Sequence, residues 1–136
     1  MKRPWVAIVA VALVLAACGS DRPRFQETEP SGGDRITPEL AEQVVLGLCT
    51  SSDQLATDPE AASTTFLDES HGGLHQIARE LEEVDREAAG QLLEAKAAVE
   101  GGFASGAPTP EQMAALLVAT RNGLSKLGLD PPACPE

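Results

Sequence analysis

Apolar residues beyond position 36 recur at alternating steps of three and four, which is the spacing of an amphipathic helix. The longest run of this kind extends from about Pro59 to Glu100, and shorter stripes occupy about Pro38 to Cys49 and about Pro110 to Leu127. The repeated positions of the long run are Leu67, His71, Leu74, Ala78, Leu81, Asp85, Ala88, Leu92, Ala95 and Val99. Because no stretch alternates apolar and polar residues as a strand does, the pattern predicts an all-α domain.

Three segments carry the signals of a helix start. A capping side chain, a proline and an acid follow one another in Thr37-Pro38-Glu39, Asp58-Pro59-Glu60 and Thr109-Pro110-Glu111. The capping oxygen accepts from a free N–H group, the proline has no N–H to lose, and the acid interacts with the positive end of the helix dipole. Gly72-Gly73 interrupts the long run, and we expect a kink there. Gly128 is expected to cap the last helix in a left-handed conformation. The sequence therefore predicts a small three-helix, up-down-up bundle with a long, kinked second helix.

The chain opens with a targeting signal. Lys2 and Arg3 precede an uninterrupted apolar run over residues 5–17. The run is shorter than the roughly 20 residues that cross a membrane, and its length is typical of a signal peptide. It ends in Leu15-Ala16-Ala17-Cys18, which resembles the lipobox of bacterial lipoprotein precursors. That resemblance implies cleavage just before Cys18 and attachment of a diacylglycerol to its sulfur.

This interpretation divides the chain into three parts. Residues 1–17 are the cleaved signal peptide, residues 18–36 are the lipidated cysteine and a flexible tether, and residues 37–136 are the helical bundle. The tether is rich in Gly, Ser, Pro and charge and has no apolar period. We therefore expect a protein that a lipid holds to the extracytoplasmic face of a bacterial cell membrane.

Charge narrows the range of partners. The chain has 10 Lys+Arg and 21 Asp+Glu, a formal net charge of −11. Its only aromatic residues are Trp5, Phe25, Phe66 and Phe103. An acidic chain repels phosphates and offers few rings for base stacking, so nucleic acid is not an expected partner. The acid excess also means that the lipid, and not attraction to anionic headgroups, would hold the protein at the membrane.

The remaining cysteines form an even pair. Once Cys18 carries lipid, Cys49 and Cys134 are left, and an even pair in an exported protein favours a disulfide. The bond would fasten the end of the first helix to the C-terminal tail. In an up-down-up bundle these two points lie at the same pole, whereas four antiparallel helices would place them at opposite poles. The pairing therefore favours three helices.

Metal binding is the one candidate for site chemistry. His71 and His75 lie four residues apart, on one face of a helix, and imidazole and carboxylate together suit Cu²⁺ or Zn²⁺. The candidate ligands are His71, His75, Asp68, Glu82 and Asp85. In the structural alternative His71 is a half-buried member of the stripe and His75 a surface residue. Asp85 then either reaches solvent or pairs with His71, Arg79 or Arg121.

No enzyme signature accompanies these residues. The sequence has no nucleophile elbow, phosphate-binding loop, dinucleotide fingerprint or calcium loop. Pairs such as Lys96/Glu100 have the spacing of ordinary solvated helix pairs. We therefore expect a non-enzymatic, membrane-anchored helical module that binds an envelope protein. Metal binding or delivery and a purely structural envelope role are the alternatives.

Overall fold

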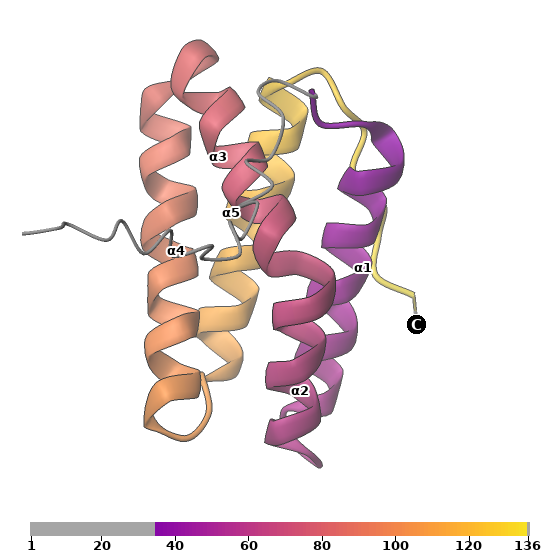
Figure 1. Cartoon of the computed structure of the whole chain (residues 1–136), viewed down its shortest axis with the longest axis vertical. Helices are drawn as coiled ribbons and strands as arrows, with labels where there is room; N and C mark the ends of the chain where they lie inside the picture. Colours follow the sequence, from indigo (N-terminus) through magenta and orange to yellow (C-terminus); the bar gives the residue numbers. More distant parts are fainter. Residues whose placement is uncertain (1–34, 136) are drawn as a thin grey trace, which may run out of the picture. The chain divides into compact units, whose positions relative to one another are not determined.

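The domain consists of helices that lie side by side along their length (Figure 1). A computed structural model describes residues 35–135, and the expected signal peptide, the lipidated Cys18 and most of the tether lie outside these residues. The elements are α1 (Pro38–Gln54), α2 (Pro59–Thr65), the π-helix η1 (Phe66–His71), α3 (Gly72–Val84), α4 (Arg86–Ser105) and α5 (Pro110–Lys126). The described part of the chain contains no strand, which confirms the all-α prediction.

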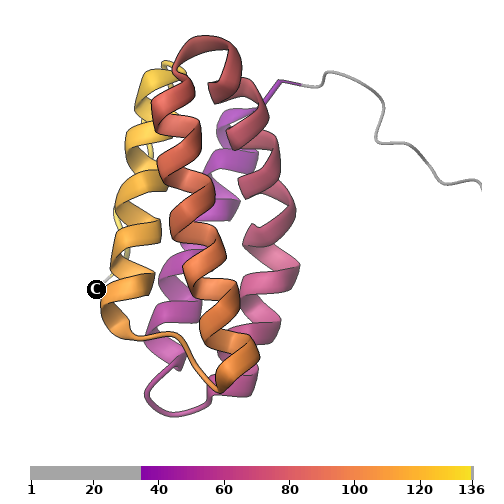
Figure 2. The ribbon, with the colours of Figure 1, turned by 90° about the vertical axis from the view of Figure 1, so that its left-hand side faces the viewer.

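These elements form four antiparallel rods. α2, η1 and α3 follow one another without leaving helical backbone, so they make a single rod. α1 runs down, the α2–η1–α3 rod returns, α4 runs down again and α5 returns (Figures 1 and 2). α1 contacts both the α2–η1–α3 rod and α5, and α4 contacts α3 and α5. The core lies along the axis that the four rods share.

The expected three-helix arrangement is wrong because the long predicted helix breaks at Asp85. This residue has φ −151° and ψ 88°, and its side chain accepts a hydrogen bond from the Ala88 N–H at 3.0 Å. It therefore caps the start of α4 instead of contributing to the apolar stripe. The apolar stripe continues across this break because α3 and α4 both pack against the same core, so periodicity alone did not reveal it. Gly72-Gly73, where we expected a kink, lies within continuous helical backbone.

Gly73 has a packing role instead. A Cβ built on Gly73 would clash with Cγ2 of Val44 on α1, whereas one built on Gly72 would meet nothing within 4 Å. The absence of a side chain at Gly73 thus lets α3 lie directly against α1. Val44 has no exposed surface, so this close approach lies within the core.

The predicted helix starts are confirmed. The side chains of Thr37, Asp58 and Thr109 accept from the backbone N–H three residues later, and Thr109 forms a reciprocal capping box with Gln112. At the other end of α5, Gly128 adopts φ 78°, and the Leu129 N–H donates to the Leu124 carbonyl at 3.0 Å. These contacts satisfy groups that helix ends leave without partners.

The π-helix shifts the inward face by one residue. Phe66 is buried, whereas Leu67, which the stripe placed inward, is 54% exposed. Ser70 also turns inward, and its hydroxyl donates to the Val44 carbonyl at 2.9 Å. A wider helical turn adds one residue to the count, so a stripe with a period of 3.6 fails here.

Over residues 35–135 the core is aliphatic, and Phe66 supplies its one fully buried ring. Its largest fully buried side chains are Phe66, Leu48, Leu74, Ile77, Leu81, Leu92, Met113, Leu116, Leu124, Val44, Val45 and Val99. Each such side chain contributes roughly 1.5–3 kcal/mol of transfer free energy, which chain entropy largely offsets. Contacts that add to this core, including a disulfide bond, therefore matter for the stability of the fold.

Candidate functional site

A polar cluster joins α4 to the rod that precedes it. His71, at the end of η1, places Nε2 2.8 Å from Oε1 of Glu100. Nζ of Lys96 donates to the same oxygen at 2.6 Å. The rings of His71 and His75 meet edge to face, with their centroids 4.8 Å apart. Oε1 of Glu100 thus contacts a histidine of the α2–η1–α3 rod and a lysine of its own helix, α4.

Lys96 is the residue of this cluster that sequence reasoning misjudged. Its side chain is only 4% exposed, so the Lys96–Glu100 contact is not the solvated surface pair we expected. Lys96 lies four residues after Leu92 and three before Val99, both buried, so it occupies a position on the inward face of α4. That spacing indicates an inward position for Lys96. Ala95, however, lies on nearly the same face of the helix, and alanine is buried far more often than lysine.

The cluster changes two pKa values. Burial alone would raise the pKa of Glu100, but the hydrogen bond and charge of Lys96, together with His71, hold it below its ordinary value. The pKa of His75 is also lowered, first by partial desolvation and then by the positive charge of Lys96. The cluster therefore favours an ionised Glu100 and a neutral His75 near neutral pH.

The five candidate metal ligands do not form one site. His71 and His75 are adjacent as predicted, but the carboxylate beside them belongs to Glu100 and not to Asp68, Glu82 or Asp85. Over residues 35–135, no group of three or more His, Cys, Asp or Glu side chains could hold a metal ion. The metal-binding interpretation therefore has no support in the geometry.

Asp85 takes a partner that sequence reasoning did not name. Besides capping α4, its Oδ2 lies 3.0 Å from Nζ of Lys126, at the end of α5. The hydrogen bond from the Ala88 N–H and the contact with Lys126 lower the pKa of Asp85. The expected partners, His71, Arg79 and Arg121, form no ion pair with Asp85 in the described structure. Lys126 was a missed candidate because the four-rod topology, which brings the end of α5 to the α3–α4 turn, was not foreseen.

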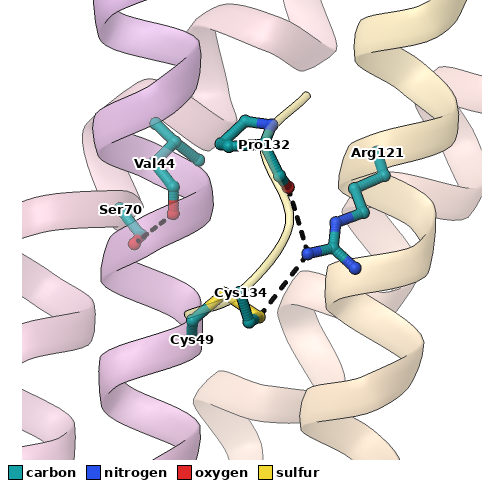
Figure 3. The surroundings of a disulfide bond; sticks show 6 residues. All are labelled: Val44, Cys49, Ser70, Arg121, Pro132 and Cys134. Atoms are coloured by element: carbon teal, nitrogen blue, oxygen red, sulfur yellow. Dashed lines mark hydrogen bonds between the residues drawn. A yellow bond between two sulfur atoms is a disulfide. The ribbon is translucent and has the colours of Figure 1, made fainter. Parts of the chain in front are cut away.

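The predicted disulfide is present, although the three-helix topology that the pairing was expected to favour is not. Cys49 and Cys134 are bonded, with their Cα atoms 5.6 Å apart. α1 continues past Cys49 to Gln54, so Cys49 lies within the helix and not at its end. After α5 the tail turns back along α1 and reaches Cys49 partway down (Figures 1 and 3). Because the tail runs back along α1, Cys134 can reach Cys49 even though the bundle has four antiparallel rods.

Arg121 on α5 holds the same tail. Its Nη2 donates to the Pro132 carbonyl at 3.1 Å and lies 3.5 Å from Sγ of Cys134 (Figure 3). Its Nε is buried without a hydrogen-bond partner in the described structure. The tail is thus fixed on one side by a covalent bond to α1 and on the other by hydrogen bonds from α5. We call residues 128–135 the strap.

A concave surface lies beside Arg35 and Ile36, the first residues of the described chain. This polar groove has a volume of about 550 Å³. It is lined by Arg35, Ile36, Gln76, Arg79, Glu80, Glu83, Val84, Lys126, Leu127 and Leu129. Residues 76, 79, 80, 83 and 84 follow one another at helical steps along one face of α3. Val84 is 64% exposed there, a high value for an apolar side chain.

Comparisons with known proteins supply no family. No family model matches the chain, and neither a curated protein nor a solved structure matches it. Within residues 35–135, no helix is long and apolar enough to span a bilayer. Inferences about function therefore rest on the residues themselves.

Proposed function

We propose that this chain is an extracytoplasmic lipoprotein whose helical domain is a non-enzymatic module that binds another envelope component. The observation that carries the binding role is the polar groove, because a concave surface with apolar walls and several charged groups is typical of a recognition site. The lipobox resemblance supports the anchor, and the disulfide supports an oxidising location.

The position of the groove favours this role. Arg35 and Ile36 line it and are the first residues of the described chain, so the tether would enter the bundle beside it. The strap contributes Leu129 to its wall, and Cys134 fixes the strap to α1. One wall of the groove thus belongs to a strap that a covalent bond fixes to α1. A preorganised surface loses less entropy on binding than a mobile one.

In-cell photocrosslinking tests the binding role. A photoreactive amino acid at Val84, which lines the groove, should capture a discrete species. The same probe at Val118, on α5 and outside the groove, should not. The two valines are 64% and 57% exposed, so accessibility is matched. Identical products at both positions, or no product at Val84, would contradict a specific partner and favour the purely structural role.

Membrane fractionation tests the anchor separately. Cys18→Ala removes the thiol that the lipobox resemblance assigns to lipid. We expect the variant to leave the membrane fraction or to accumulate as an uncleaved precursor, which is distinguished by its mass. A Cys18→Ala protein that is cleaved and still sediments with membranes would refute a lipid anchor at this residue.

A further inference from the structure

We propose that the polar groove binds a small monoanion, namely a carboxylate carried on a short aliphatic body such as the free C-terminus of a peptide. This inference rests on the binding role proposed above and names the chemistry of what the groove accepts. It follows from the distribution of cations, from their existing partners and from the apolar wall.

Cations are concentrated at the groove. Residues 35–135 contain sixteen acids but only six bases, which are Arg35, Arg79, Arg86, Lys96, Arg121 and Lys126. Arg35, Arg79 and Lys126 line the groove. Of the others, Lys96 is buried against Glu100 and Arg121 holds the strap. The groove thus has three bases against two acids, in a domain where acids strongly outnumber bases.

Two of these cations remain available. Lys126 pairs with Asp85, and the Glu80 carboxylate accepts from the Ile36 N–H. Arg35 and Arg79 are exposed and form no ion pair with any residue that the structure describes. A guanidinium presents two parallel N–H groups that match the two oxygens of a carboxylate. These two guanidinium groups therefore favour an anion in the groove.

The acids of the groove set the charge of that anion. Glu80 and Glu83 remain on the same face of α3 as Arg79, so a dianion would meet more repulsion than a monoanion. The apolar wall is formed by Ile36, Val84, Leu127 and Leu129. An aliphatic group beside the carboxylate would cover Val84, which water otherwise contacts. A volume of about 550 Å³ accommodates a ligand of this size.

The test uses N-acetyl-leucine as the probe, with the full chain in neutral detergent micelles. We expect saturable shifts of the Val84 and Leu129 amide resonances, with a Kd on the order of 1 mM for so small a ligand. N-acetyl-leucine amide has the same aliphatic body without the charge, and it should bind about ten-fold more weakly or worse. Inorganic phosphate should also bind more weakly than N-acetyl-leucine.

Two variants locate the binding group. Arg79→Gln should weaken N-acetyl-leucine binding at least about ten-fold, whereas Arg86→Gln, which removes a nearby exposed cation outside the lining, should leave it unchanged. Equal binding of the acid and its amide, tighter binding of phosphate, or an unchanged Kd in Arg79→Gln would each overturn the inference. A Val84 crosslink that persists without N-acetyl-leucine binding would refute the carboxylate chemistry and leave the binding role standing.

Discussion

The adjacent glycines of the second rod offer a sharp test of how α1 and α3 pack. Gly72 and Gly73 lie one after the other in helical backbone and should gain the same helix propensity, about 1 kcal/mol, on replacement by alanine. Only their surroundings differ. A methyl group at Gly72 meets nothing within 4 Å, whereas one at Gly73 clashes with Cγ2 of Val44.

The two substitutions should therefore differ in their effect on the free energy of unfolding. Gly72→Ala should raise the free energy of unfolding by about 0.5–1 kcal/mol. At Gly73 the clashing atom belongs to a β-branched side chain with no exposed surface, so it has little freedom to move. Overpacking of a core costs about 1–3 kcal/mol, so Gly73→Ala should be less stable than Gly72→Ala by that amount.

Urea denaturation of both variants, followed by circular dichroism, measures this difference. The propensity gain is common to both, so it cancels and leaves the cost of packing at Gly73. Equal free energies of unfolding for the two variants would refute the close approach of α3 to α1. A change in the denaturant slope would show that the substitution also altered the two-state transition.

Three further predictions concern the bonds that link the rods. Replacing Cys49 and Cys134 together with alanine should lower the free energy of unfolding by about 4–5 kcal/mol in the chain-entropy model, since the bond spans a separation of 85 residues; a loss below about 1 kcal/mol in urea denaturation would contradict it. Lys96→Met should be nearly neutral or stabilising, whereas Glu100→Gln should be strongly destabilising because it strands a buried ammonium; equal losses in thermal denaturation would contradict this asymmetry. In a histidine NMR titration the pKa of His75 should lie below 6.5 and rise in Lys96→Met. Because the unfolded chain takes up the His75 proton first, this residue should make the fold less stable as pH falls from about 7 toward that lowered pKa.

Local signals in the sequence predicted local structure well. The Thr37, Asp58 and Thr109 starts and the Gly128 cap depend on a few neighbouring residues, and each is present. The disulfide was also predicted, because pairing by elimination needs no geometry once Cys18 is assigned to lipid. The number of rods was not predicted, since an aspartate can either interrupt an apolar stripe or end a helix, and periodicity does not separate the two.

The site was harder to predict because its parts meet through packing. His71, which contacts Glu100, lies at the end of the π-helix. No pattern of neighbouring residues in the sequence predicted that π-helix. Lys96 was misjudged because one helical period accommodates either it or Ala95 on the inward face. The groove draws on three segments that meet only because α5 ends beside the α3–α4 turn, a position set by the unexpected fourth rod.

The strap has a mechanical consequence. Because Cys134 is bonded to Cys49, residues 50–133 lie inside a covalent ring. A force applied between the two ends of the chain would pass through the first part of α1, across the disulfide and out through the last residues. α2, η1, α3, α4 and α5 would lie outside this load path. Pulled by its ends, the domain should lengthen only by unwinding the start of α1, and most of its helices should stay folded under tension until the disulfide is reduced.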